Sequence, residues 1–397
     1  MKAFSKLFIP SHFQKVNGKR KEASSINTLS FTALGFLTAL TLSGPVQSAT
    51  PKPPQVLCLD GDCVTTGAVS KTNKKKLHPG HYMLLFFNKN SETPYDQVDR
   101  IKDNPNFKGI QKQYLWRNLE PTKNNYTLSQ IRQDLDYVRS IGKQLVLQIM
   151  IIGPQSQNFL PKYLLNGPEY DGGVMVHVRN TNQPPTKWVA KRWNRPLQER
   201  LGNLYDAIAA EFDNDPNLEA VNIPESSAAV PCPGKPGADP TFTAEGMVEE
   251  MKYEHTRLAG AFQKTQVFRY LNWMRCGPIS LLGDLARDAT SKGIGFGGPD
   301  THPWEETMIN GVYSLYPQYS ATNILAQSVQ YRNWDRKWPN GKLVTGREML
   351  DFIVKDLQVD YVFWLQRQPQ FDEQVIPLVN EFPNPFPVKN IKTLLTK

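Results

Sequence analysis

The sequence predicts an α/β protein, a (β/α)8 TIM barrel that spans residues 78–397. Short apolar segments alternate with helical segments from residue 81 to residue 367, which is the order of elements that such a barrel needs. The main alternative is a doubly wound open sheet. No glycine-rich phosphate-binding loop follows the first predicted strand, and this disfavours the open sheet.

The predicted strands are short apolar segments bounded by turn residues. In chain order they cover residues 81–88, 109–116, 144–152, 218–223, 265–274, 293–298, 322–330 and 360–367. Two further segments, "YDGGVMVHV" and "KWVAKRW", lie between the third and fourth strands and predict a hairpin over one end of the barrel.

Signals for the start of helices fall between these strands. Thr127-x-x-Gln130 fits a capping box ahead of the helix that precedes the third strand. Pro196 is predicted to open the helix before the fourth strand, because proline is tolerated in the first turn of a helix. Thr345-x-x-Glu348 fits a second capping box, ahead of the last strand.

Residues 1–49 are predicted to be a signal peptide. The segment holds six basic residues and one acidic residue, and its apolar stretch ends near the small residues Ser48 and Ala49. Residues 50–77, rich in Pro, Lys and Thr, predict a linker. We therefore expect a periplasmic or secreted protein, with an uncleaved anchor as the alternative and no other membrane contact. The charge outside the leader is too small to indicate a nucleic-acid partner.

The four cysteines gain meaning from the expected export, because disulfides persist in oxidising compartments. Cys58 and Cys63 can close a small loop. Cys232 and Cys276 lie in the loops after the fourth and fifth strands, which are neighbours in a barrel, so these two are predicted to pair with Cα atoms within about 7 Å. Four free thiols are the alternative. The scattered histidines predict no metal site, and no cofactor is implied.

Polar and aromatic residues cluster where the predicted strands end, which is the end of a barrel that carries its chemistry. Amides and aromatic rings together suit a sugar, and carboxylates suit cleavage of a glycosidic bond. The residues at these positions are Asn88, Trp116, Arg117, Glu120, Gln148, Asn222, Glu225, Asn272, Trp273, Asp300, His302, Gln327, Gln330, Trp364 and Gln366.

Two segments resemble a known family. "WRNLEPTKNNYTLSQIRQDLDYVRSIGKQLVLQIM" resembles the W-x-x-L-E-P segment of clan A glycoside hydrolases, the β-galactosidase-like barrels in particular, and "RWNRPLQERLGNLYDAIAAEFDNDPNLEAVNIPESS" resembles their following helix and fourth strand. The resemblance implies a glutamate acid at the end of the fourth strand, directly after an asparagine. Glu225 is the candidate, although Ile223 and Pro224 separate it from Asn222. The clan's nucleophile is a seventh-strand glutamate, where this chain has Gln327 and Gln330.

These observations predict an exported glycoside hydrolase-like protein that acts on a carbohydrate or polysaccharide. Glu225 is the predicted general acid and Asp300 the partner carboxylate. The predicted substrate-binding residues are Trp116, Arg117, Gln148, Asn222, Asn272, His302, Gln330 and Trp364.

The competing interpretation is a non-catalytic carbohydrate-binding or polysaccharide-assembly barrel that lacks the seventh-strand nucleophile. Each candidate also has a plainer explanation. Glu225 can accept loop N–H groups or pair with Arg117 or Arg269, Asp300 can serve a turn, and the tryptophans can be core residues. For Glu120 we expect a structural role, because a proline and a helix follow it directly.

Overall fold

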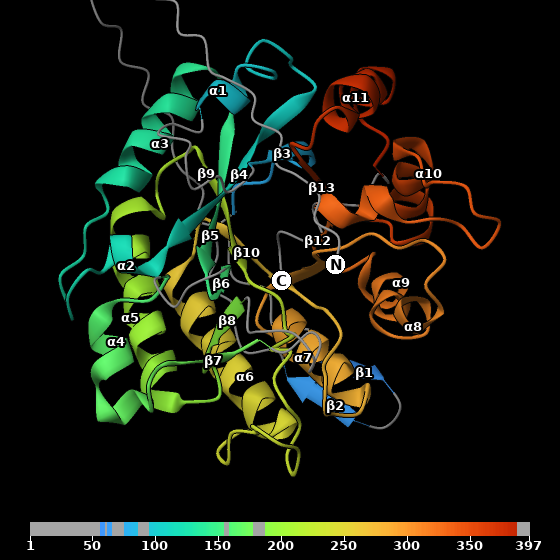
Figure 1. Ribbon diagram of the computed structural model, residues 1–397. Helices are drawn as coiled ribbons and strands as arrows, with labels where there is room; N and C mark the ends of the chain where they lie inside the picture. Colours follow the sequence, from blue (N-terminus) through green and yellow to red (C-terminus); the bar gives the residue numbers. More distant parts are fainter. Residues whose placement is uncertain are drawn as a thin grey trace, which may run out of the picture. The chain divides into compact units, whose positions relative to one another are not determined.

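Eight parallel strands close into a barrel in the computed structural model (Figure 1). The structure describes the backbone of residues 56–59 and 62–65, and residues 75–85, 95–154, 159–177 and 187–386. The predicted signal peptide, most of the predicted linker, and Asn88 lie outside these residues. The barrel strands are β3 (Gly80–Leu84), β4 (Phe107–Leu115), β5 (Gln144–Met150), β9 (Leu218–Ile223), β10 (Gln266–Tyr270), β11 (Gly295–Gly298), β12 (Leu325–Val329) and β13 (Tyr361–Leu365).

Each neighbouring pair of these strands is parallel, and β9 pairs with both β5 and β10. The predicted fold class is therefore confirmed, and each of the eight predicted segments overlaps one barrel strand. Figure 1 shows the long helices α3, α5, α6 and α7 on the outside of the strands. The helices are α1 (Tyr95–Val98), α2 (Trp116–Leu119), α3 (Ser129–Ser140), α4 (Lys162–Asn166), α5 (Arg195–Phe212), α6 (Ala244–Ala261), α7 (Ser280–Ser291), α8 (Glu306–Ile309), α9 (Tyr316–Tyr319), α10 (Gly346–Asp351) and α11 (Ile376–Glu381).

Short 3-10 and π segments join these helices: η1 (Pro168–Tyr170), η2 (Val312–Leu315), η3 (Tyr331–Asp335), η4 (Phe352–Asp356) and η5 (Phe371–Val375). The predicted hairpin is confirmed as part of a three-stranded antiparallel sheet of β6 (Ile152–Pro154), β7 (Val174–Val176) and β8 (Lys187–Ala190). Separately, β1 (Val56–Leu59) and β2 (Asp62–Thr65) form an antiparallel pair in which Cys58 stands opposite Cys63.

Most helix-start predictions agree with the structure. Thr345 and Glu348 form the predicted capping box of α10, and Pro196 lies in the first turn of α5 behind the capping side chain of Asn194. The capping box predicted at Thr127 is wrong. Helix α3 begins after Leu128, and no side chain caps it.

The inside of the barrel is filled by a cluster that includes the aromatic rings of Tyr82, Phe268, Tyr361 and Phe363. Side chains two residues further along each strand point the same way and lie nearer the carboxyl ends. On five strands the corresponding position holds a polar group (Gln111, Gln148, Asn222, Tyr270 and Ser328), whereas β3 and β13 carry Leu84 and Leu365 there. An aromatic layer therefore seals the barrel, and a layer that is polar on most of these strands lies above it as the floor of the mouth.

The opposite end of the barrel is closed by residues that precede the first strand. Lys76 Nζ donates to the main-chain oxygens of Asp213 and Asp215 at 2.8 and 2.7 Å. Leu77 packs against the inner cluster, and His78 Nδ1 lies 2.7 Å from the buried carboxylate of Glu219. The barrel unit therefore begins before residue 78, so the last residues of the predicted linker are part of it.

Candidate active site

Glu225 lies just beyond the end of β9 and is half-buried. Asn272, just beyond β10, donates from Nδ2 to Glu225 Oε2. The backbone N–H of Trp273 donates to Asn272 Oδ1 at 2.7 Å. The amide oxygen of Asn272 is thus engaged, so its NH2 group faces the carboxyl of Glu225. One oxygen of this carboxyl is held by a neutral donor at the barrel mouth.

The two loops that carry these residues are joined side by side. Ser226 N donates to Tyr270 O at 3.0 Å, and Ser226 Oγ exchanges hydrogen bonds with the main-chain N and O of Asn272 at 2.9 and 2.8 Å. Further out, Cys232 and Cys276 form a disulfide with a Cα–Cα distance of 5.3 Å. The predicted bridge is confirmed, and it ties the loop of Glu225 to the loop of Asn272.

Replacing Cys232 and Cys276 together by serine is expected to lower the free energy of unfolding by about 2–4 kcal/mol, because the bridge restricts the unfolded chain. Chemical denaturation of oxidised wild type and the double variant measures the difference. Wild type under reducing conditions should match the variant. Equal stability of all three samples would show that the bridge does not stabilise the barrel.

Asp300 is the second carboxylate at the mouth, two residues beyond β11. Burial raises the pKa of Glu225 above its usual value, and the negative charge of Asp300 raises it further. The hydrogen bond from Asn272 and the charge of Arg192 oppose this effect. The main-chain oxygen of Asp300 accepts from Tyr313 at 2.7 Å and from Gln327, which fixes the backbone that carries the carboxylate.

His302 follows Asp300 and is buried, with its backbone N–H bonded to the Tyr313 hydroxyl at 3.0 Å. Burial lowers the pKa of His302, against the opposing effect of the Asp300 carboxylate. Its Nδ1 atom has no hydrogen-bond partner within the described residues. The ring of Trp304 stands edge-on to it, with the centroids 6.4 Å apart.

The polar floor beneath these residues consists of uncharged groups. Gln148 accepts from Gln113 Nε2 at 2.7 Å, and the Tyr270 hydroxyl bonds to Gln111 at 3.1 Å and to Ser328. Asn222 is fully buried. Its amide approaches the Tyr270 hydroxyl, yet neither polar atom makes a hydrogen bond of regular geometry in the part of the chain that is described. The amide of Asn222 is therefore a buried polar group that is left unsatisfied within the described residues.

Four predicted substrate-binding residues do not join this group. Trp116 and Trp364 have no exposed surface, and their indole N–H groups bond to Glu120 at 3.0 Å and to His81 at 3.1 Å. Trp364 follows Phe363, which points into the barrel, so its own ring faces the helices and packs in the outer core. Arg117 is exposed on α2, and the side chain of Gln330 caps η3.

The W-x-x-L-E-P segment builds a structural network. Glu120 has no exposed surface and accepts hydrogen bonds from Trp116, from the backbone of Asn124 at 3.0 Å and from Tyr163 at 2.9 Å. It also forms a buried ion pair with Arg200 of α5. These contacts fasten α2 and α5 together behind the mouth, which agrees with the structural role expected for Glu120.

Trp273 is a residue that the sequence did not place among the ligand-binding groups. Its side chain is 50% exposed, which is unusual for a tryptophan, and it directly follows the amide that holds Glu225. The available signal was an aromatic residue next to an amide at a strand end. An exposed indole in the loop that carries Asn272 offers a flat apolar surface to solvent.

The seventh strand carries an amide where the family pattern has a carboxylate. Gln327 is fully buried, accepts from the Tyr316 hydroxyl at 2.6 Å and donates to Asp300 O, so it supports the loop of Asp300. No group of three or more His, Cys, Asp and Glu side chains suited to a metal ion occurs within the described residues. Two carboxylates at a barrel mouth, such as Glu225 and Asp300, are of a residue type that can carry acid–base or nucleophilic chemistry.

Comparison with known proteins finds similarity in structure alone. The sequence matches no protein-family model and no curated protein. A GH36 α-galactosidase from Geobacillus stearothermophilus, solved with stachyose, is 9% identical with a TM-score of 0.44, and the match covers 77% of this chain and 42% of that chain. The present chain therefore spans less than half of that enzyme.

Two other solved structures match along most of their length. Xylanase B from Clostridium stercorarium F9 is 13% identical with a TM-score of 0.41, and the match covers 73% of this chain and 86% of that chain. Endo-glycoceramidase II from a Rhodococcus species is 11% identical with a TM-score of 0.38, and the match covers 70% of this chain and 80% of that chain. No residue of the present chain takes a role from these similarities.

Proposed function

We propose that this protein is an exported glycoside hydrolase that cleaves a carbohydrate, with Glu225 as the general acid. The observation that carries the proposal is the half-buried carboxyl of Glu225 at the end of the fourth barrel strand. Its pKa is raised by burial and by the negative charge of Asp300. A raised pKa increases the share of a carboxyl that is protonated at a given pH, and a protonated carboxyl can donate to the leaving oxygen of a glycosidic bond.

Asp300 is the second carboxylate of the proposed reaction. It lies close enough to Glu225 for its charge to raise the pKa of that residue, and its backbone is fixed by Tyr313 and Gln327. It would either attack the anomeric carbon or activate a water molecule. The two routes differ in the carboxyl–carboxyl distance, which is about 5–5.5 Å in retaining enzymes and about 6.5–9.5 Å in inverting enzymes.

The surroundings of the pair favour a carbohydrate over an apolar ligand. The floor carries several amides and hydroxyls, and the buried amide of Asn222 has no regular hydrogen-bond partner within the described residues. Such groups match the hydroxyls of a sugar, and the exposed indole of Trp273 matches its C–H face. The proposal therefore assigns Gln148, Asn222, Asn272 and Trp273 to the recognition of a sugar ring.

The second candidate is a carbohydrate-binding barrel without catalysis. One observation favours it: Gln327 and Gln330, at the position of the family's nucleophile, are both engaged in structural contacts. Incubation of the protein with a panel of aryl glycosides and oligosaccharides separates the two candidates. Release of product that depends on Glu225 supports the hydrolase, whereas calorimetric binding without product over long incubation supports the binding protein.

Export is a further part of the proposal. The Cys232–Cys276 bridge supports it, because structural disulfides are rare in proteins of the reducing cytoplasm. No helix of the described residues is long and apolar enough to span a membrane. We expect the mature protein to begin near residue 49 or 50, which N-terminal sequencing of the protein from its native host tests. An intact Met1 in the cytoplasmic fraction would contradict the proposal.

Replacing Asp300 by asparagine is expected to lower the pKa of Glu225, because the change removes a negative charge that disfavours the ionised carboxyl. Titration of the Glu225 carboxyl by 13C NMR, with the signal assigned through its loss in Glu225→Gln, measures the shift. Glu306→Gln, an exposed carboxylate in the first turn of α8, is the matched control. An unchanged pKa in Asp300→Asn would remove Asp300 from the proposed pair.

A further inference from the structure

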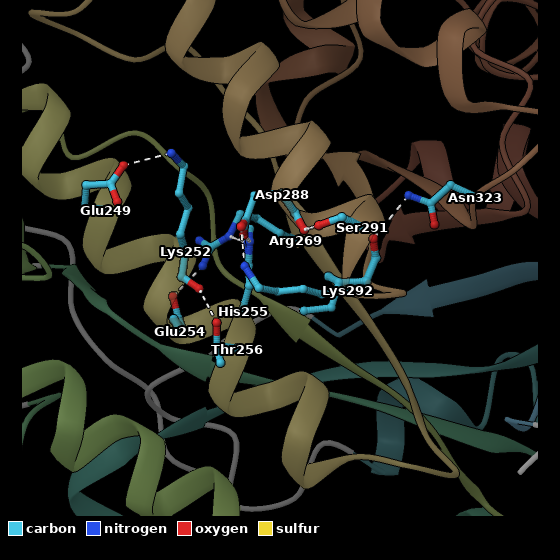
Figure 2. A network of polar contacts seen from close by, with 11 residues as sticks. Glu249, Lys252, Glu254, His255, Thr256, Arg269, Asp288, Ser291, Lys292 and Asn323 are labelled. Carbon is cyan, nitrogen blue, oxygen red and sulfur yellow. Dashed lines mark hydrogen bonds and ion pairs between the residues drawn. The ribbon is translucent and has the colours of Figure 1, made fainter. Parts of the chain in front are cut away.

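A network of charged side chains joins α6, α7 and β10 (Figure 2). Arg269 of β10 points away from the barrel interior. Neither Arg269 nor His255 of α6 has any exposed surface. Figure 2 shows Arg269 together with Glu254, His255, Asp288 and Lys292. The proposed reaction uses none of these residues.

The contacts form a continuous chain from α7 to the end of β9. Asp288 Oδ2 lies 2.8 Å from His255 Nδ1, and Arg269 Nε donates to His255 Nε2 at 2.6 Å. Arg269 also pairs with Glu254 through Nη2, and its Nη1 donates to the main-chain oxygen of Pro224 at 3.3 Å. The chain therefore ends on the peptide group that immediately precedes Glu225.

The tautomer of His255 follows from these contacts. Arginine can only donate, so His255 Nε2 must accept and the ring proton resides on Nδ1. That proton is donated to Asp288. Burial, assisted by the charge of Arg269, lowers the pKa of His255 to about 3, so the ring stays neutral at physiological pH. Asp288 thus fixes the tautomer that Arg269 requires.

A second arginine holds the next peptide groups. Arg192 is buried, and its Nη2 donates to the main-chain oxygens of Glu225 at 2.7 Å and Ser227 at 3.3 Å. Two buried cations thus bind successive carbonyls of the loop that carries the proposed acid. Removing charges from water is costly, and buried ion pairs are often replaceable by apolar residues without loss of stability. Stability alone is therefore a poor reason for this arrangement.

We propose that Asp288, His255 and Arg269 are positioning residues that hold the Pro224 carbonyl and thereby aim the carboxyl of Glu225 at its Asn272 partner. Arg192 clamps the other side of the same residue. The catalytic consequence rests on the proposed function, whereas the effect on the Glu225 carboxyl does not. Neither Arg269 nor Arg117 pairs with the side chain of Glu225 in the described contacts, so the predicted ion-pair alternative is replaced by this backbone clamp.

The test is Asp288→Asn. Lys292 Nζ donates to the other oxygen of Asp288, so the amide oxygen of the variant faces Lys292 and its NH2 faces His255. The ring proton must then move to Nε2, where it opposes the N–H of Arg269. We expect release of the Pro224 carbonyl, loss of the Asn272 bond to Glu225, and a rise in the pKa of Glu225 by about one unit.

The direction of this shift separates positioning from plain electrostatics. Removal of a negative charge by itself would lower the pKa of a carboxyl, whereas loss of a hydrogen bond to the ionised form raises it. Asp284→Asn makes the same charge change on α7 at an exposed carboxylate paired with Arg287, and it is the matched control. Lys292→Met removes the other partner of Asp288 and leaves His255 untouched.

Three readouts are measured: the His255 tautomer by 15N NMR, the Glu225 pKa by 13C NMR, and hydrolysis of the aryl glycoside that wild type cleaves best. We expect kcat of Asp288→Asn to fall by about 10- to 100-fold with little change in KM. An Nε2–H tautomer in wild type overturns the proposal even if the variant fails to fold. An unchanged or lowered Glu225 pKa in the folded variant also overturns it. If wild type cleaves no glycoside while both NMR results hold, the hydrolase proposal fails and the positioning chain stands.

Discussion

Replacing Glu225 by glutamine is expected to reduce hydrolysis of any glycoside that the protein cleaves by about 10²- to 10⁴-fold. Glutamine keeps the shape of the side chain and can still contact Asn272, but it has no carboxyl proton to give to the leaving oxygen. Steady-state kinetics on the best aryl glycoside measures the loss. Binding of a non-cleaved sugar, followed by calorimetry, should change little.

The matched control for this variant is Glu306→Gln, which neutralises an exposed glutamate in the first turn of α8. Its activity should equal that of wild type. Full turnover by Glu225→Gln would place the acid elsewhere, and Asp300 would be the next residue to change. A variant that fails to fold would instead make Glu225 a structural anchor, because its carboxyl bond to Asn272 joins two loops.

Replacing Arg200 by alanine is expected to lower the free energy of unfolding by about 3–5 kcal/mol. The change leaves the carboxylate of Glu120 charged and without exposed surface, with its one ion-pair partner in the described network removed. Arg200 also donates to Asn124 at 2.8 Å and to the Tyr163 hydroxyl at 3.1 Å, so a whole cluster loses its centre. Urea denaturation followed by circular dichroism measures the effect.

Arg132→Ala is the comparison for this second variant, because Arg132 forms an exposed ion pair with Glu211. Such pairs contribute about 0–1 kcal/mol, so the variant should remain close to wild type. Similar losses for Arg132→Ala and Arg200→Ala would mean that the W-x-x-L-E-P network does not anchor the barrel. Replacing Arg200 and Glu120 together by apolar residues should recover part of the loss, since no buried charge is then left unpaired.

The barrel strands could be predicted because each is a short apolar run with a clear boundary. The linker boundary could not, because Lys76 and Leu77 look like a solvated segment until Asp213, Asp215 and the inner cluster are brought to them by folding. The capping box at Thr127 failed for a related reason. A four-residue pattern fits many turns, and here the chain enters α3 one residue later.

The types of residue at the candidate site could be predicted from the sequence, but not every individual residue that belongs to it. Glu225, Asn272 and Asp300 follow from reading strand ends, because all parallel strands of a barrel end at the same face. Trp364 was misplaced because the side of a strand on which a residue lies depends on the alternation along that strand, and Phe363 takes the inward position. The contacts of Arg192 and Arg269 with the loop of Glu225 could not be predicted from the sequence. They join β10, α6 and the segment after β8, which are distant from one another in the sequence.

Residues 76–78 contact the end of the barrel opposite the candidate site, and this has a practical consequence for the design of shortened versions of the protein. A chain shortened to start at Pro79 would lose the residues that close this end of the barrel. It would lack the contacts of Lys76 with Asp213 and Asp215, the side chain of Leu77, and the contact of His78 with Glu219. Glu219 would then keep its bond to Tyr361 at 2.6 Å as a buried carboxylate with fewer donors. Shortened versions should therefore begin ahead of Lys75, and a tag or a fused partner should be joined there.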